Sequence, residues 1–223
     1  MNNQRNLAKI AGYALVLMAI IAGFSFGFAY PKIYNQDQFE LAQRTLTENF
    51  QLYNWMLLGI LIVLLLDLLV SWALYLYFKH EHKSLALWSF ILRVLYTMIF
   101  GIATCYLANN LLQSNTNNGL IVENYRSFQS IWSFGLIIFG IHLLLIGVLM
   151  KLHKLIPKIL WILTIIAGAS YVLVHTLKTI APSLRAMSEQ LNIILALPMA
   201  LGEIGLAIWL IIKGGQKARK IPD

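Results

Sequence analysis

The stretch SLALWSFILRVLYTMIFGIATCYLANNLL, residues 84–112, is strongly apolar but has an arginine, Arg93, near its middle. It is longer than the ~20 apolar residues with which an α-helix crosses a bilayer. Arginine stays charged in proteins, and a guanidinium at bilayer depth is estimated to cost from ~3 to more than ~10 kcal/mol. Such a residue is tolerated only beside counter-charges, carbonyl groups or water. We therefore predict a membrane-spanning helix packed inside a bundle of others.

The composition of the whole chain agrees with that prediction. Of 223 residues, 59% are hydrophobic and 12% are charged, and the mean hydropathy is +0.71, whereas a soluble domain has ~25% charged residues. Six apolar segments occur at about 7–29, 51–78, 84–112, 128–150, 157–177 and 191–212. We predict an all-α, polytopic membrane protein in which residues 1–223 form one six-helix transmembrane domain. The single cysteine, Cys105, excludes an internal disulfide framework.

The cations that flank the six segments predict the orientation of the chain. Eleven fall on one side: Arg5, Lys9, Lys79, Lys83, Lys151, Lys154, Lys158, Lys213, Lys217, Arg219 and Lys220. Five fall on the other: Lys32, Arg44, Arg126, Lys178 and Arg185. Because cytoplasmic loops are enriched in Lys and Arg, both termini are predicted to be cytoplasmic, and the chain is predicted to lie in the cell (cytoplasmic) membrane. The net charge of +8 is then a topology signal, and the predicted surroundings are a lipid bilayer, with no nucleic-acid partner.

The first segment and the loop after it hold two local patterns. Gly23 and Gly27 form a GxxxG pair, which we interpret as a packing face for another helix. Tyr30-Pro31 is predicted to end the helix. In the outer loop, about 37–50, Asp37 and Glu40 have capping-box spacing and apolar residues recur at helical intervals. This predicts a short amphipathic helix at the outer interface, which either covers helix ends or acts as a lid.

Four ionisable residues fall at one depth on four different segments. Counted from the nearest inner lysine at ~1.5 Å per residue, Asp67, Arg93, His142 and Glu203 lie ~14–18 Å into a ~30 Å hydrocarbon core. We predict one polar cluster at the centre of the bundle. In it Arg93 bridges Asp67 and Glu203, and His142 lies at the edge.

Two further residues are assigned to the same site from their helical spacing. Ser71 lies one turn from Asp67, and Tyr96 lies on the polar side of the segment that contains Arg93. Pro198 is expected to kink the last segment beside Glu203. The remaining histidines are placed outside the site; we expect His175, for example, to be interfacial. No catalytic residue, metal site or cofactor is predicted.

Three functions are compatible with this cluster. With neutral histidine its net charge is −1, so it could take up a proton or small cation, as in a carrier that binds or translocates a small molecule or ion. A six-helix carrier is small, so a homodimer is expected. In the second, an intramembrane enzyme uses Asp67, His142 and Glu203 with Arg93, although no HExxH or GxSxG motif supports it. In the third, the cluster is a salt-bridge network in a structural or assembly partner.

Ordered motifs along the chain resemble one known family. They read LAKIAGYALVLMAIIAG, LLDLLVSWALY, SLALWSFILRVL, FGIHLLLIGVLM, PKILWILTIIAGASYV and ILALPMALGEIGLAIWLIIKG. The series resembles the bacterial membrane-protein family catalogued as domain of unknown function 4386. The resemblance spans nearly the whole chain and includes Asp67, Arg93, His142 and Glu203. It implies a six-helix integral membrane protein and leaves the activity open.

Overall fold

The computed structural model describes residues 2–34, 41–112, 118–180 and 182–215, and within these ranges the chain is helical with no strand. The elements are α1 (Asn2–Ala22), the π-helix η1 (Gly23–Ala29), α2 (Tyr30–Ile33), α3 (Ala42–Glu48), α4 (Phe50–Phe78), α5 (Lys83–Leu112), α6 (Asn118–Leu152), α7 (Lys158–Ile180), the 3-10 turn η3 (Pro182–Leu184) and α8 (Arg185–Ile212). Six helices are long and apolar enough to span a membrane, with α1, η1 and α2 joined in one span. The predicted six-helix membrane fold is confirmed.

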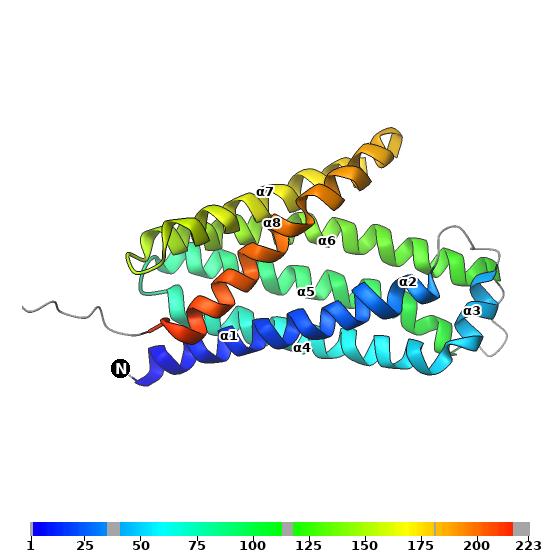
Figure 1. Cartoon of the computed structure of the whole chain (residues 1–223), viewed down its shortest axis with the longest axis horizontal. Coiled ribbons are helices and arrows are strands. Elements are labelled where there is room, and N and C mark those ends of the chain that lie inside the picture. The colour runs from blue at the N-terminus through cyan, green and yellow to red at the C-terminus, as the bar shows by residue number, and fades with distance from the viewer. Residues whose placement is uncertain (1, 35–40, 113–117, 181, 216–223) are drawn as a thin grey trace, which may run out of the picture.

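The six spans run antiparallel along the length of the bundle (Figure 1), and their contacts form a closed ring. Each span packs on the next along the chain, and α8 closes the ring by packing on α1. We call the end that holds residues 2–5, 79–82, 153–157 and 213–215 the terminal end, and the opposite end, with α3, the far end. The prediction that the terminal end is cytoplasmic stays a prediction.

The interior consists of two apolar clusters with polar residues between them. The far-end core includes Tyr53, Phe100 and Phe128, and the terminal-end core includes Phe78 and Ile146. Along α4, Val63 belongs to the first and Val70 to the second, with the buried Asp67 between them. Arg93 has the corresponding position on α5. The predicted charges therefore lie at the level where the two apolar cores meet.

Helices approach most closely at glycines, but not at the pair predicted from the sequence. A Cβ on Gly140 of α6 would lie 2.8 Å from the carbonyl oxygen of Gly168 on α7, so these two backbones touch. Gly12 allows a similar approach of α1 to α8. Gly23 and Gly27, in contrast, have no atom of another residue within 4 Å of the Cβ position. Their interpretation as a packing face is wrong within this chain, because η1 turns them away from the bundle.

Two predicted helix boundaries are also wrong. The first span continues through Pro31 to Ile33, because the π-helix ends at Ala29 and Pro31 then lies in the first turn of α2, where its missing N–H is not needed. The fourth span begins at Asn118 and not near residue 128. Its added turns keep one buried face, made by Ile121 and Tyr125, so the helix extends beyond the apolar segment.

The predicted amphipathic segment at 37–50 is only partly described. α3 occupies Ala42–Glu48 and buries Ala42 and Leu46 against the far-end core. Asp37 and Glu40, which suggested a capping box, lie outside the described residues. Pro198 lies inside α8, and the helix continues through it.

The ring is fastened at the terminal end by Arg5. Its guanidinium donates four hydrogen bonds to carbonyl oxygens at the end of α8: Leu210 (3.1 Å), Ile211 (2.5 Å), Ile212 (3.3 Å) and Gly214 (2.7 Å). The last carbonyls of a helix have no partner within it, so one planar donor group satisfies the end of α8. Gly215 then turns back with φ +69° and donates its N–H to the Tyr77 hydroxyl at 3.1 Å.

Replacing Arg5 by alanine is expected to loosen the last turn of α8. Hydrogen bonds to charged groups contribute ~1.5–3 kcal/mol when buried, and this group is only partly buried, so we expect about 1.4 kcal/mol, or about tenfold faster amide exchange at the end of α8. Arg5→Lys keeps the charge without the fork of donors and should recover only part of the protection. Hydrogen exchange measured by mass spectrometry tests this; unchanged exchange in Arg5→Ala would contradict it.

Candidate functional site

Three of the predicted residues meet in the centre of the ring. Asp67 of α4, Arg93 of α5 and His142 of α6 are 2%, 1% and 1% exposed. Each is placed by a long apolar helix whose neighbouring turns belong to the two cores, so none can withdraw to the surface. We call these three residues with Ser89 the polar layer.

Arg93 binds Asp67 through two nitrogens. Nε donates to Oδ1 of Asp67 at 2.9 Å and Nη2 donates to the same oxygen at 2.5 Å. No hydrogen bond within the described ranges reaches Oδ2 of Asp67. The predicted counter-charge for the buried arginine is therefore supplied by α4, the helix before it in the chain.

The hydrogen bonds of His142 specify its protonation. Nδ1 lies 2.8 Å from the carbonyl oxygen of Ser89 and 2.9 Å from its hydroxyl. A carbonyl oxygen only accepts, so Nδ1 holds the proton. Nε2 lies 3.3 Å from Nη1 of Arg93, which only donates, so Nε2 accepts. His142 is thus a neutral histidine that links α5 and α6.

The rest of the guanidinium is surrounded by soft and aromatic groups. Its Cζ lies 5.3 Å from the centre of the Phe139 ring, and Nη2 points at the Met18 sulfur at 4.0 Å. Phe139 also packs against Tyr96 and, edge-on, against Tyr171. Aromatic faces attract cations, which adds to the stabilisation of a charge at this depth.

Glu203 does not form the predicted bridge to Arg93. Among the described residues, Arg93 has an ion pair only with Asp67. α8 packs on α7 and α1, whereas α5 packs on α4 and α6, so the two helices lie on opposite sides of the ring. Glu203 is half-buried and close enough to interact electrostatically with Arg93 and Asp67. It lies beside the polar layer and not in it.

The other two predicted residues have different surroundings. Tyr96 is buried beside Phe139, and its hydroxyl accepts a 3.5 Å hydrogen bond from Trp132 Nε1. Ser71 is buried too, but its hydroxyl donates to the carbonyl of Leu68 in its own helix at 2.8 Å. Tyr96 thus contacts the surroundings of Arg93, while Ser71 has no contact of its side-chain oxygen with the polar layer within the described ranges.

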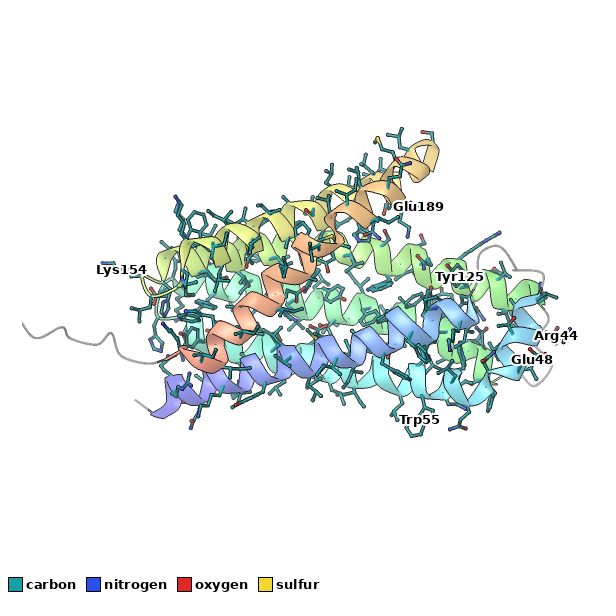
Figure 2. All side chains as sticks on the ribbon, in the orientation of Figure 1. Arg44, Glu48, Trp55, Tyr125, Lys154 and Glu189 are labelled. Atoms are coloured by element: carbon teal, nitrogen blue, oxygen red, sulfur yellow. The ribbon has the colours of Figure 1, made fainter. Side chains whose placement is uncertain are left out.

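A cavity of about 490 Å³ lies between α6, α7 and α8, toward the far end. It is lined by Gln129, Trp132, Ser133, Leu136, Tyr171, His175, Lys178, Glu189, Asn192, Ala196, Met199 and Ala200. We call it the vestibule. Figure 2 labels Glu189 on the far-end turns of α8, at the opposite end of the bundle from Lys154. Ala200, which lines the vestibule, lies one turn before Glu203 on α8.

Polar side chains line the vestibule wall and bind one another. Lys178 Nζ donates to Gln129 Oε1 at 3.0 Å, and Gln129 Nε2 donates to the Tyr30 hydroxyl at 2.8 Å. The Ser133 hydroxyl and His175 Nδ1 are 2.9 Å apart. His175 is buried in the bundle, and its predicted interfacial depth stays a prediction. The ring of Tyr171 stacks on His175 and lies between the vestibule and Phe139.

The sequence reasoning missed the vestibule, although a signal for it existed. On α7, Tyr171, His175 and Lys178 recur at intervals of four and three, which places them on one face. On α6, Gln129 and Ser133 have the same relation. Both sets lie near the ends of apolar segments, where polar residues are ordinarily explained by the membrane interface.

Within the described ranges no three His, Cys, Asp or Glu side chains gather as a metal site would require. Asp67, His142 and Glu203 do not converge, since His142 uses Nε2 for Arg93 and Glu203 stays on α8. The arrangement of Asp67, Arg93 and His142 is a hydrogen-bonded ion pair with a neutral histidine.

Comparison with known proteins gives a family without an assigned activity. The family described as "Domain of unknown function (DUF4386)" matches residues 10–214. An uncharacterized protein of the archaeon Archaeoglobus fulgidus is 31% identical over 158 residues, which cover 71% of this chain and 83% of that protein. Because this relative is archaeal, the expectation of a bacterial family was too narrow. No solved structure matches.

Proposed function

Because this chain belongs to the DUF4386 family, which has no assigned activity, we propose a function from its site: it binds a small polar solute or ion in the vestibule and carries it across the membrane. One observation supports this most directly. A cavity of about 490 Å³, partly lined by polar side chains, is bordered by Ala200, which lies one turn from the carboxylate Glu203 on α8; Glu203 in turn interacts electrostatically with the Arg93–Asp67 pair.

Ionisable side chains are costly inside a membrane span. Lipid offers nothing to a polar side chain, so ionisable residues in spans face cavities, partners or water, and they mark solute pathways more often than not. Gln129, Asn192 and Lys178 place polar groups on the wall of this cavity, where Lys178 donates to Gln129. Glu203, one turn from the lining residue Ala200, adds a carboxylate that can change its charge.

The alternatives fit the geometry less well. A structural salt-bridge network accounts for Arg93, Asp67 and His142, but it leaves the vestibule and Glu203 without a role. An enzyme based on Asp67, His142 and Glu203 would need these side chains to converge on one substrate atom, and they do not. The homodimer and the cytoplasmic position of both termini remain predictions.

Cysteine accessibility tests whether the vestibule contains water. In a Cys105→Ser background, Ala200→Cys is expected to react with a membrane-impermeant thiosulfonate added from the far-end side, because the thiolate that reacts forms only in contact with water. Leu197→Cys is the matched control, since residue 197 is 66% exposed on the same helix but does not line the vestibule.

The pattern of labelling decides the result. Reaction of Ala200→Cys without reaction of Leu197→Cys supports a water-filled vestibule, and reaction only from the far-end side also establishes the topology. Absence of labelling at both positions would contradict the proposal, because the cavity would then be filled by lipid.

A further inference from the structure

Building on the proposed function, we infer that Glu203 is the group that takes up and releases a proton through the vestibule, whereas Asp67, Arg93 and His142 keep fixed charges. The coupled ion is then a proton. Of Asp67, Arg93, His142 and Glu203, only Glu203 can change its charge without breaking a contact that the fold needs.

Asp67 is held in its ionised form by a buried arginine. Both hydrogen bonds that Asp67 accepts are donated by Arg93, and both residues are almost fully buried. A proton on Oδ2 would neutralise the ion pair of a guanidinium that cannot itself lose charge. An uncompensated buried charge is strongly destabilising, so Asp67 is a poor site for reversible proton exchange.

His142 is held in its neutral form by the same arginine. Its Nδ1 already has a proton, which it donates to the Ser89 carbonyl. A second proton on Nε2 would remove the hydrogen bond that this atom accepts from Arg93. Two N–H groups and two positive charges would then face each other. His142 therefore acts as an acceptor for Arg93 and does not titrate while that contact exists.

Glu203 is the remaining carboxylate, and its surroundings differ. Within the described ranges it forms no ion pair and no side-chain hydrogen bond, and it is only half-buried. With Arg93 at +1, Asp67 at −1 and His142 neutral, ionised Glu203 gives this region its net charge of −1. Taking up one proton at the carboxylate, to form a carboxylic acid, brings the region to zero.

The charged and titratable groups around Glu203 leave it free to exchange. α7 presents the Tyr171 hydroxyl, which interacts electrostatically with Glu203, and the deeper Arg93 and Asp67 act on it from across the bundle. From α1, Lys9 and Tyr13 are exposed outside the ring.

The other charged groups nearby are committed elsewhere. Arg5 of α1 binds the end of α8, and His175 of α7 binds Ser133. On α8 itself, Glu189 lies about four turns from Glu203, at the far end of the vestibule, and Lys213 is almost three turns away toward the terminal end.

The vestibule supplies the route for the proton. Met199 and Ala200 line it one turn from Glu203, and Tyr171 borders both the vestibule and the Phe139 ring beside Arg93. A metal ion is a less suitable ligand than a proton for the site beside Glu203. Hard cations such as Mg²⁺ or Ca²⁺ use about six to eight oxygen ligands, and one carboxylate with one phenol offers few.

Infrared difference spectroscopy on the full chain in lipid nanodiscs tests the inference. Between alkaline and mildly acidic buffer, wild type is expected to gain the stretching band of a protonated carboxyl group in an apolar environment. Glu203→Gln should lose this band, while Glu203→Asp should keep it at a shifted frequency. Glu123→Gln, which removes an exposed carboxylate of α6, should leave it unchanged.

Two outcomes overturn the inference. Wild type could gain no such band, or the band could persist in Glu203→Gln. Comparison with the cysteine labelling separates the two proposals. If Ala200→Cys is labelled but no carboxyl band depends on Glu203, the proposal of solute binding stands and the proton site at Glu203 is rejected. If Ala200→Cys is not labelled, the water-filled vestibule itself is rejected.

Discussion

Replacing Asp67 by asparagine is expected to lower the free energy of unfolding by about 3–5 kcal/mol. Asparagine nearly preserves the shape of the side chain but removes the negative charge that Arg93 binds at 2.9 and 2.5 Å. The guanidinium cannot release its proton and is 1% exposed. The loss of stability therefore comes mainly from leaving an uncompensated cation between two apolar cores. The two hydrogen bonds by themselves contribute less.

A double substitution separates these causes. Replacing a whole buried ion pair by apolar residues of similar size is often neutral or stabilising. Asp67→Leu combined with Arg93→Met should therefore recover most of the stability lost in Asp67→Asn. If the double variant is as unstable as the single one, packing and not charge explains the loss.

The measurement is reversible unfolding in mixed micelles of mild detergent and SDS. Ser71→Ala is the matched control one turn away on α4, because its hydroxyl donates only to its own helix; we expect a change of at most about 1 kcal/mol. Wild-type stability in Asp67→Asn would show that Arg93 finds another counter-charge or water.

The number and type of the helices followed from the sequence because hydrophobic length has one main explanation in a membrane. The exact start of α6 did not, since Glu123, Asn124 and Arg126 look like loop residues. In the structure Asn124 is buried and donates to Asn110 Oδ1 at 2.6 Å, so a polar residue stabilises the helix extension. Hydropathy cannot distinguish a satisfied polar residue from a solvated one.

The common level of the charged residues along the bundle could also be predicted, but the order of the helices around the ring could not. A fixed rise per residue placed Asp67, Arg93 and His142 at one level, and the structure brings these three together. Glu203 shares the level, yet α8 is adjacent to α7 and α1. Lateral position depends on where backbones can approach, and the sequence offers several small-residue pairs for that role.

The approach of α6 to α7 leads to the second large effect. Gly168→Leu is expected to lower the free energy of unfolding by about 3 kcal/mol, near the upper end of the usual range for overpacking. A Cβ on Gly168 would lie 2.7 Å from the Gly140 carbonyl oxygen and 2.9 Å from the backbone nitrogen of Leu144. Backbone atoms of a helix cannot move aside as a side chain can, so the two helices must separate.

That separation would also change the vestibule, because α6 and α7 form two of its walls. Gly168→Leu should alter the labelling rate of Ala200→Cys as well as the unfolding midpoint. Gly101→Leu is the matched control: its Cβ position on α5 has no neighbour within 4 Å, so the substitution should be neutral or stabilise by up to about 1 kcal/mol through helix propensity. Equal losses of stability at residues 101 and 168 would mean that replacing any glycine of these helices is destabilising. A loss of stability and a changed labelling rate at residue 168 alone would show that the close crossing of α6 and α7 supports both the fold and the cavity beside Glu203.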